Sequence, residues 1–293
     1  MAKVLLTGGT GLIGTQLSSL LKRKGYEVSI LTRTPKKEDE YAWDVHNNYI
    51  DDKALDDIGY VIHLAGAGIA DKKWTSERKQ EIIDSRVKSA ELLLRKVKAL
   101  NTPLKAFISS SGIGYYGAVT TEKIFKENDP SYDDYISEVC QLWEKAAFVF
   151  KVEGIRTVAL RTGVVLSKDG GALSKMKTPI ISPIGSGKQY LPWIHIDDLC
   201  EMYLKAIEDA EMSGVFNAVA PEHHTSTSFS KTLAKNYKKP FILLGVPAFL
   251  LKLIFGELSV ILLKGSRVSS EKIESKGFTF RFPTLQNALK NLF

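Results

Sequence analysis

The chain has 293 residues, of which 44% are hydrophobic and 25% are charged. These shares are close to the averages of globular proteins, so they exclude a disordered, collagenous or disulfide-stapled chain. The 40 Lys and Arg residues outnumber the 33 Asp and Glu residues, which gives a net charge of +7. Because the basic residues are scattered along the chain, we expect no nucleic-acid partner and favour an anionic small substrate.

Strand and helix patterns alternate along the first half of the chain. The expected strands cover residues 3–7, 28–31, 60–65, 104–109 and 155–161, and the expected helices cover residues 12–24, 75–100 and 133–153. Helices of this length between strands indicate crossover connections in a parallel sheet with helices on both faces. We therefore predict an α/β fold, a doubly wound parallel sheet of the Rossmann type.

The pattern changes in the second half. Residues 167–192 are rich in Gly, Pro, Ser and Lys, and we expect an ordered loop belonging to a substrate lobe. A short strand at 193–196, a helix capped by Asp197 and a returning strand at 215–219 follow. The rest is helical or irregular. The sequence predicts a dinucleotide-binding domain over residues 1–220 and a smaller, mostly helical domain over residues 221–293.

The environment of the protein is predicted from its cysteines and apolar segments. Cys140 and Cys200 are too few for a disulfide framework, and the first strand begins at once, which leaves no room for a signal peptide. The apolar stretch 241–263 contains Lys252 and Glu257, so we predict buried or groove-lining helices and no membrane span. No metal-ligand spacing occurs, and we expect no metal. The expected location is the cytoplasm, and a homodimer is left open.

A glycine-rich turn follows the first strand and opens the first helix. It runs from Thr7 to Gly14. Glycines at this spacing permit a tight turn, close approach of the backbone to a pyrophosphate and close packing of helix on strand. The helix N-terminus then holds the phosphates. We therefore predict a dinucleotide site with contacts from Gly8, Thr10, Gly11, Leu12 and Ile13.

The end of the second strand indicates which dinucleotide is bound. Proteins that prefer NAD place an acidic residue there for the ribose hydroxyls. Here the strand ends at Arg33, and no acidic residue occurs before Glu38. Because a cation pairs with a 2′-phosphate, we predict NADP(H), with NAD(H) the less favoured cofactor. The alternative is that Arg33 is only a solvated surface charge.

Further motifs continue along the chain. They are Val61 to Gly66, Ser109-Ser110-Ser111 with Tyr116-Gly117, Arg161-Thr162-Gly163, and Trp193 to Asp198. Together with the glycine-rich turn they resemble the extended short-chain dehydrogenase/reductases, a superfamily of sugar-nucleotide epimerases and dehydratases. The resemblance implies that Ala65 and Gly66 line the cofactor ribose and that Arg161 belongs to the cofactor site.

A second set of motifs narrows the resemblance. It comprises Trp74, Ser85-Arg86-Val87, Gly112 to Gly117, Cys140 to Glu144, Pro183 to Gly187 and Gly277 to Phe280. These resemble a branch labelled "epimerase family protein", which carries a C-terminal domain of unknown function. They span nearly the whole chain. The branch has no settled substrate, so the resemblance implies a fold and a cofactor site rather than a reaction.

One departure from the superfamily bears on catalysis. Its enzymes use a Tyr and, four residues later, a Lys that lowers the pKa of the Tyr and anchors the nicotinamide ribose. In this chain Val139 and Cys140 stand at that distance from Tyr135. The lysine is therefore missing. We expect Ser111 to orient a substrate oxygen and Tyr116 or Tyr135 to transfer the proton.

The predicted function is an NADP-dependent epimerase- or reductase-like oxidoreductase. Its expected substrate is a small polar carbonyl or alcohol, a nucleotide-linked one included. Several basic residues occur around the expected substrate lobe and would suit an anionic substrate. They are Lys168, Lys175, Lys177, Lys188 and Arg267. Two alternatives are a non-catalytic NADP(H)-binding sensor and an interaction protein that uses the apolar stretch 241–263.

Overall fold

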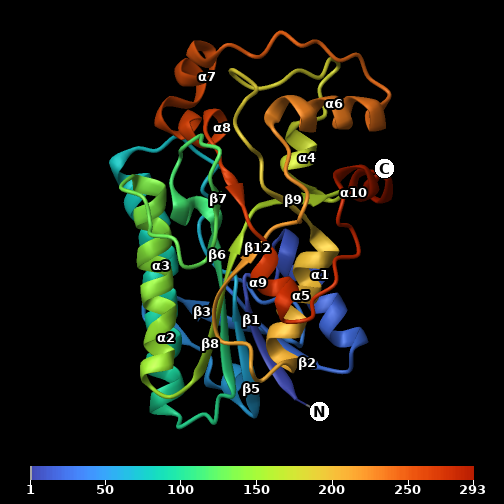
Figure 1. The fold of residues 1–293 in the computed structure, drawn as a ribbon. Coiled ribbons are helices and arrows are strands. Elements are labelled where there is room, and N and C mark those ends of the chain that lie inside the picture. Colours follow the sequence, from blue (N-terminus) through green and yellow to red (C-terminus); the bar gives the residue numbers. More distant parts are fainter. Residues whose placement is uncertain (1) are drawn as a thin grey trace.

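The computed structural model describes residues 2–293, which are built around an eight-stranded sheet (Figure 1). The strands are β1 (Lys3–Thr7), β2 (Glu27–Thr32), β3 (Glu40–Asp44), β4 (Tyr49–Ile50), β5 (Ile58–His63), β6 (Ala106–Gly112), β8 (Arg156–Thr162) and β12 (Gly214–Ala218). Their order in the sheet is β12-β8-β6-β5-β1-β2-β3-β4. All neighbours are parallel except β3 and β4. The chain leaves β1 for β2 on one side and reaches β5 on the other, which creates a crevice at the carboxyl end of β1.

Helices cover both faces of the sheet, as the sequence predicts. The helices α1 (Leu12–Arg23) and α5 (Ile196–Glu208) pack on one face, and α2 (Ser76–Ala99) and α3 (Tyr135–Val152) pack on the other (Figure 1). Leu17 and Met202 are fully buried in the core under the first pair. Leu93 and Phe150 belong to the core under the second pair, where Phe150 stacks on Phe107. Full burial of each such side chain contributes about 1.5–3 kcal/mol.

Side chains at the helix N-termini decide where α2 and α3 begin. Thr75 accepts the N–H of Arg78 (3.2 Å), and Asp134 accepts the N–H of Ser137 (2.9 Å). Each bond satisfies a backbone donor that has no partner within its helix. Helix α1 differs, because its N-cap is Gly11 and no side chain caps it. Its first N–H groups are therefore left for another acceptor.

Two local predictions were wrong. The sequence showed no strand between residues 32 and 60, yet β3 pairs with β2 in parallel and β4 turns back along β3. These segments are short and charged and have little intrinsic preference for strands. They become strands because the edge of β2 offers hydrogen-bond partners. The cap of α5 is His195 rather than Asp197, since His195 Nδ1 accepts the N–H of Asp197 (3.1 Å).

Two small sheets and several short helices complete the fold, most of them in the second half of the chain. They are β7 (Ile124–Phe125), β9 (Val164–Ser167), β10 (Gly170–Gly171), β11 (Trp193–His195), β13 (Arg267–Val268), α4 (Ala172–Lys175), α6 (Ser226–Tyr237), α7 (Ala248–Phe255), α8 (Val260–Leu263), α9 (Glu271–Ser275), α10 (Leu285–Leu292) and the 3-10 helices η1 (Asp52–Leu55), η2 (Ile113–Tyr116) and η3 (Gly256–Ser259). Helices α6, α7 and α8 lie beyond the carboxyl ends of the central strands (Figure 1). Strand β13 pairs with β7, so the last third of the chain is joined to the first half. The domain boundary at residues 220/221 stays a prediction.

The apolar stretch 241–263 is only partly covered. Leu251 and Leu258 are buried, but Leu244 and Leu253 are 82% and 75% exposed. Full burial is therefore excluded for one side of α7, whereas Lys252, Val260 and Leu263 line a cavity, as the predicted groove-lining helices would. No helix within residues 2–293 combines the length and apolar character needed to cross a membrane.

Candidate cofactor and substrate site

The glycine-rich turn has the close contacts that its sequence predicts. A Cβ on Gly14 would overlap the carbonyl oxygen of Gly8 and would lie 2.6 Å from Gly9 Cα. Gly8 itself has a φ of +67°, which favours glycine. Thr7 Oγ1 accepts the N–H groups of both Leu64 and Ala65 (3.1 Å each), which fixes the end of β5 against the turn. The backbone of the turn is therefore tightly packed against the start of α1 and the end of β5.

The N-terminus of α1 has the properties of a phosphate site. Thr10 and Gly11 are exposed, and the first turn contains no acidic residue. The side chains of Leu12 and Ile13 are partly buried against the core, and their backbone N–H groups lie in the first turn of the helix. The uncapped N–H groups and the positive end of the helix dipole favour an anion.

The residues predicted to contact the ribose groups of the cofactor lie on opposite sides of the glycine-rich turn. Arg33 is exposed at the end of β2 and takes part in none of the ion pairs among residues 2–293. Ala65 and Gly66 follow β5, and Gly66 is exposed. These positions suit the predicted contacts, which remain predictions.

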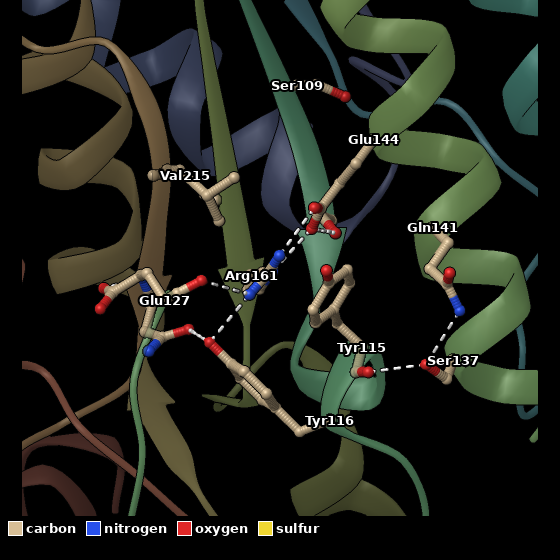
Figure 2. A network of polar contacts seen from close by, with 12 residues as sticks. Ser109, Tyr115, Tyr116, Glu127, Ser137, Gln141, Glu144, Arg161 and Val215 are labelled. Carbon is tan, nitrogen blue, oxygen red and sulfur yellow. Dashed lines mark hydrogen bonds and ion pairs between the residues drawn. The ribbon is translucent and has the colours of Figure 1, made fainter. Parts of the chain in front are cut away.

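Arg161 lies in a buried network rather than at the open crevice (Figure 2). Its Nε and Nη2 donate to the two carboxylate oxygens of Glu144 (2.7 and 2.9 Å), and its Nη1 donates to the hydroxyl of Tyr116 (3.0 Å). The guanidinium also covers the ring of Tyr115. Burial works against the charged form, but Glu144 outweighs it and raises the pKa of Arg161. Arg161 therefore has a structural role in this network, which is an alternative to the cofactor contact predicted for it.

Two of the predicted catalytic hydroxyls belong to the same network. Ser111 donates to Glu144 (2.8 Å), and Tyr116 donates to Asn217 Oδ1 (2.7 Å). Burial raises the pKa of Tyr116 to about 12, although Arg161 opposes the shift. Both residues are almost fully buried. The orienting role of Ser111 and the proton-transfer role of Tyr116 stay predictions, and both hydroxyls already have partners within the network.

Tyr135 is placed differently, in the wall of a cavity of about 570 Å³. The cavity lies between the start of α3 and the segment from α7 to α8, and its lining includes Trp74, Tyr135, Ile136, Glu257, Leu263 and Lys264. Trp74 packs edge-on against the Tyr135 ring, and the Tyr135 hydroxyl donates to the carbonyl of Lys79 (3.2 Å). Burial raises the pKa of Tyr135 to about 12, which Arg86 partly opposes. The phenol therefore keeps its proton at neutral pH.

The positions of the missing lysine are apolar. Val139 and Cys140 are both about 1% exposed. Burial raises the pKa of Cys140 to about 12, so its thiol stays protonated. A protonated, buried thiol reacts poorly with oxidants, so we expect no redox role for Cys140 itself.

Arg86 was not singled out for any role in the sequence analysis. It is 5% exposed, although it is charged and lies on the long helix α2. The buried positions of that helix include Ile82, Arg86, Ala90 and Leu93, which share one helical face. That periodicity is the sequence signal that could have identified Arg86 as buried.

The remaining basic candidates are dispersed. Lys168, Lys175, Lys177 and Lys188 are all exposed. Arg267 pairs with Glu122 (2.9 Å) and covers the ring of Tyr190. Of these five residues, only Arg267 takes part in an ion pair within residues 2–293. Residues 2–293 include no group of three or more potential metal ligands.

Acid is expected to destabilise the protein through His63. Its ring is buried, and its Nε2 lies 2.8 Å from Ser89 Oγ. Burial, with the Arg86 cation, lowers the pKa of His63 to about 3. Below about pH 6.5 the unfolded chain takes up a proton that the folded chain cannot, so stability is lost as the pH falls toward 3. Urea unfolding should show about 1.4 kcal/mol less stability at pH 5.5 than at pH 7.5 from this residue alone.

The His63→Gln variant isolates this effect. His195, whose pKa burial lowers to about 4, adds a loss of the same sign that the variant keeps. The wild type should therefore lose about 1.4 kcal/mol more than the variant between the two pH values. Equal losses would show that His63 is not the group responsible.

Comparisons with known proteins agree with this geometry. The family model described as "NAD dependent epimerase/dehydratase family" matches residues 4–219, and that of a domain of unknown function, DUF1731, matches residues 246–292. The chain belongs to the NAD dependent epimerase/dehydratase family. An epimerase family protein of Staphylococcus aureus (strain NCTC 8325) is 35% identical, and the match covers 100% of this chain and 99% of that protein. The predicted family is therefore confirmed.

Two solved structures extend the comparison. The human epimerase family protein SDR39U1 (isoform 2), solved with NADPH, has a TM-score of 0.88 and 31% identity over 99% of this chain and 98% of that one. A nucleoside-diphosphate sugar epimerase from Corynebacterium glutamicum has a TM-score of 0.81 and 31% identity over 99% of this chain and 58% of that one. The predicted doubly wound fold is thereby confirmed.

Proposed function

We propose that the protein is an NADP(H)-dependent oxidoreductase of the epimerase family that acts on a carbonyl or alcohol. The observation that carries the proposal is the packed glycine turn beneath the uncapped N-terminus of α1, whose backbone N–H groups suit a pyrophosphate. Gly8, Gly11 and the backbone of Leu12 and Ile13 would hold the pyrophosphate. The NADPH solved with the similar human protein supports the same cofactor here.

The cavity beside Tyr135 is the proposed substrate site. When bound, NADPH supplies a hydride for the carbonyl carbon, and the product alcohol also needs a proton on its oxygen. Tyr135 is the protonated acid in the cavity wall, so we assign it that proton transfer. Apolar surface dominates the lining, and its charged members are Asp134, Lys252, Glu257 and Lys264. This lining favours a substrate with an apolar body and a charged end over the small polar one that the sequence suggested.

The cofactor choice is tested by replacing Arg33. We expect the wild type to bind NADPH at least tenfold more tightly than NADH, because a guanidinium pairs with the 2′-phosphate. In Arg33→Asp, NADPH binding should weaken at least tenfold while NADH binding changes little. Titrations followed by cofactor fluorescence measure both affinities.

A matched control separates the local effect from the change in net charge. Arg23→Asp makes the same charge change at the far end of α1, where Arg23 is exposed. It should leave the preference for NADPH intact. If the wild type binds neither cofactor, the proposed function fails.

One observation favours a non-catalytic protein, the absence of the superfamily's lysine at positions 139 and 140. Oxidation of bound NADPH by a panel of carbonyl compounds, lost in Tyr135→Phe, would support the enzyme. Tight binding of NADPH that no compound of the panel oxidises would support the alternative function, a non-catalytic NADP(H)-binding sensor.

A further inference from the structure

Arg86 lies buried behind the backbone that follows β5. A Cβ built on Gly66 would lie only 2.9 Å from Arg86 Cζ, so the guanidinium lies directly against that exposed glycine. Its Nη1 donates to the carbonyl oxygens of Ala67 (3.0 Å) and Ile82 (2.8 Å), and its Nε is buried without a partner. The head group is thus fixed at the edge of the cofactor crevice.

This cation has no counter-ion within the described part of the chain. No ion pair includes Arg86, and its aromatic neighbour is the ring of Trp143 at 4.6 Å. The acidic groups that act on it, Cys140 and Tyr135, both have pKa values raised to about 12 by burial and are neutral at pH 7. Burial lowers the pKa of Arg86 only to about 10, so its charge persists. An unpaired buried charge is costly, and a structural role alone does not require it.

The sheet order indicates which half of the cofactor Arg86 meets. Strand β1 lies between β2, which ends beside Arg33, and β5, which leads to Gly66. Arg33 and Arg86 are therefore on opposite sides of the glycine turn. Given the proposed function, on which this inference rests, Arg33 takes the adenosine 2′-phosphate. The nicotinamide half then lies on the β5 side, near Arg86.

We propose that Arg86 makes the site selective for the reduced cofactor. The nicotinamide ring of NADP⁺ is positively charged and that of NADPH is neutral. A fixed cation in a poorly solvated position repels only the charged ring, so NADP⁺ binds more weakly. Arg86 also restores a positive charge next to Cys140, where the superfamily's lysine is missing. Because its guanidinium does not give up a proton, Arg86 acts as a fixed charge and takes no part in proton transfer.

Calorimetric titration of the full chain tests this selectivity. The probes are NADPH, NADP⁺ and adenosine 2′,5′-bisphosphate, which lacks the nicotinamide half. We expect the wild type to bind NADPH about tenfold more tightly than NADP⁺. Arg86→Met should bring the two affinities within about twofold of each other and leave the bisphosphate unaffected. Arg86→Lys, which keeps the charge, should retain the preference.

Arg78→Met is the matched control. Arg78 is also buried on α2, but it pairs with Glu81 (2.7 Å) and should not affect redox selectivity. Equal wild-type affinities for NADPH and NADP⁺ would overturn the inference. So would an unchanged ratio in Arg86→Met, or a parallel loss of the bisphosphate there. If Arg86→Met does not fold, Arg86→Gln replaces it, and we expect the same loss of preference for NADPH over NADP⁺. Failure of the wild type to bind any probe would instead overturn the proposed function.

Discussion

Gly14→Ala is expected to weaken NADPH binding at least 100-fold. The added methyl group would overlap the carbonyl oxygen of Gly8 and lie 2.6 and 2.8 Å from Gly9 Cα and C. All of these are backbone atoms that cannot rotate away, so the turn must open or α1 must move off β1. Either movement displaces the N–H groups that hold the pyrophosphate, and a 100-fold loss corresponds to about 2.7 kcal/mol. Fluorescence titration measures the affinity.

The overlap should also lower stability, by about 1–3 kcal/mol as in other overpacked sites. Gly59→Ala provides the control, because a Cβ there would meet nothing closer than 3.8 Å. That variant should bind NADPH like the wild type and unfold at the same urea concentration. NADPH affinity within threefold of the wild type in a folded Gly14→Ala would show that the turn is not the phosphate site.

The fold and the glycine turn could be predicted because their signals are local. Alternating apolar runs and amphipathic segments of fixed length determine the doubly wound sheet, and the turn lies within eight consecutive residues. Strands β3 and β4 could not be predicted in this way. Their pairing depends on the neighbouring edge of β2 rather than on their own composition.

The roles of single polar residues were less predictable, because their partners are distant in sequence. Tyr116 bonds Asn217 across 101 positions, and Ser111 bonds Glu144 across 33. A motif shows that a hydroxyl is present, not which group it serves. Arg86 shows the opposite case, in which a charge that looks solvated lies on the buried face of α2. Only the assembled structure shows that Arg86 has no counter-ion among residues 2–293.

Glu144→Ala is expected to cost about 3–5 kcal/mol of the free energy of unfolding, the largest stability effect predicted for this chain. The side chains of Glu144 and Arg161 are only 9% and 3% exposed, and their two hydrogen bonds join α3 to β8. Removing the carboxylate leaves the guanidinium buried and unpaired and also frees the hydroxyl of Ser111. Urea unfolding monitored by circular dichroism gives the change.

Two further variants distinguish a buried charge from a simple loss of contacts. Asp84→Ala removes the carboxylate of an exposed pair with Lys88 and should cost less than about 0.5 kcal/mol. The double variant Glu144→Leu/Arg161→Met removes both buried charges and should recover most of the stability lost in Glu144→Ala, because no unpaired ion remains. If this double variant folds and still binds NADPH, Arg161 acts through the fold and not through the cofactor. If it folds but has lost NADPH binding, while Gly59→Ala retains it, the predicted cofactor role of Arg161 holds.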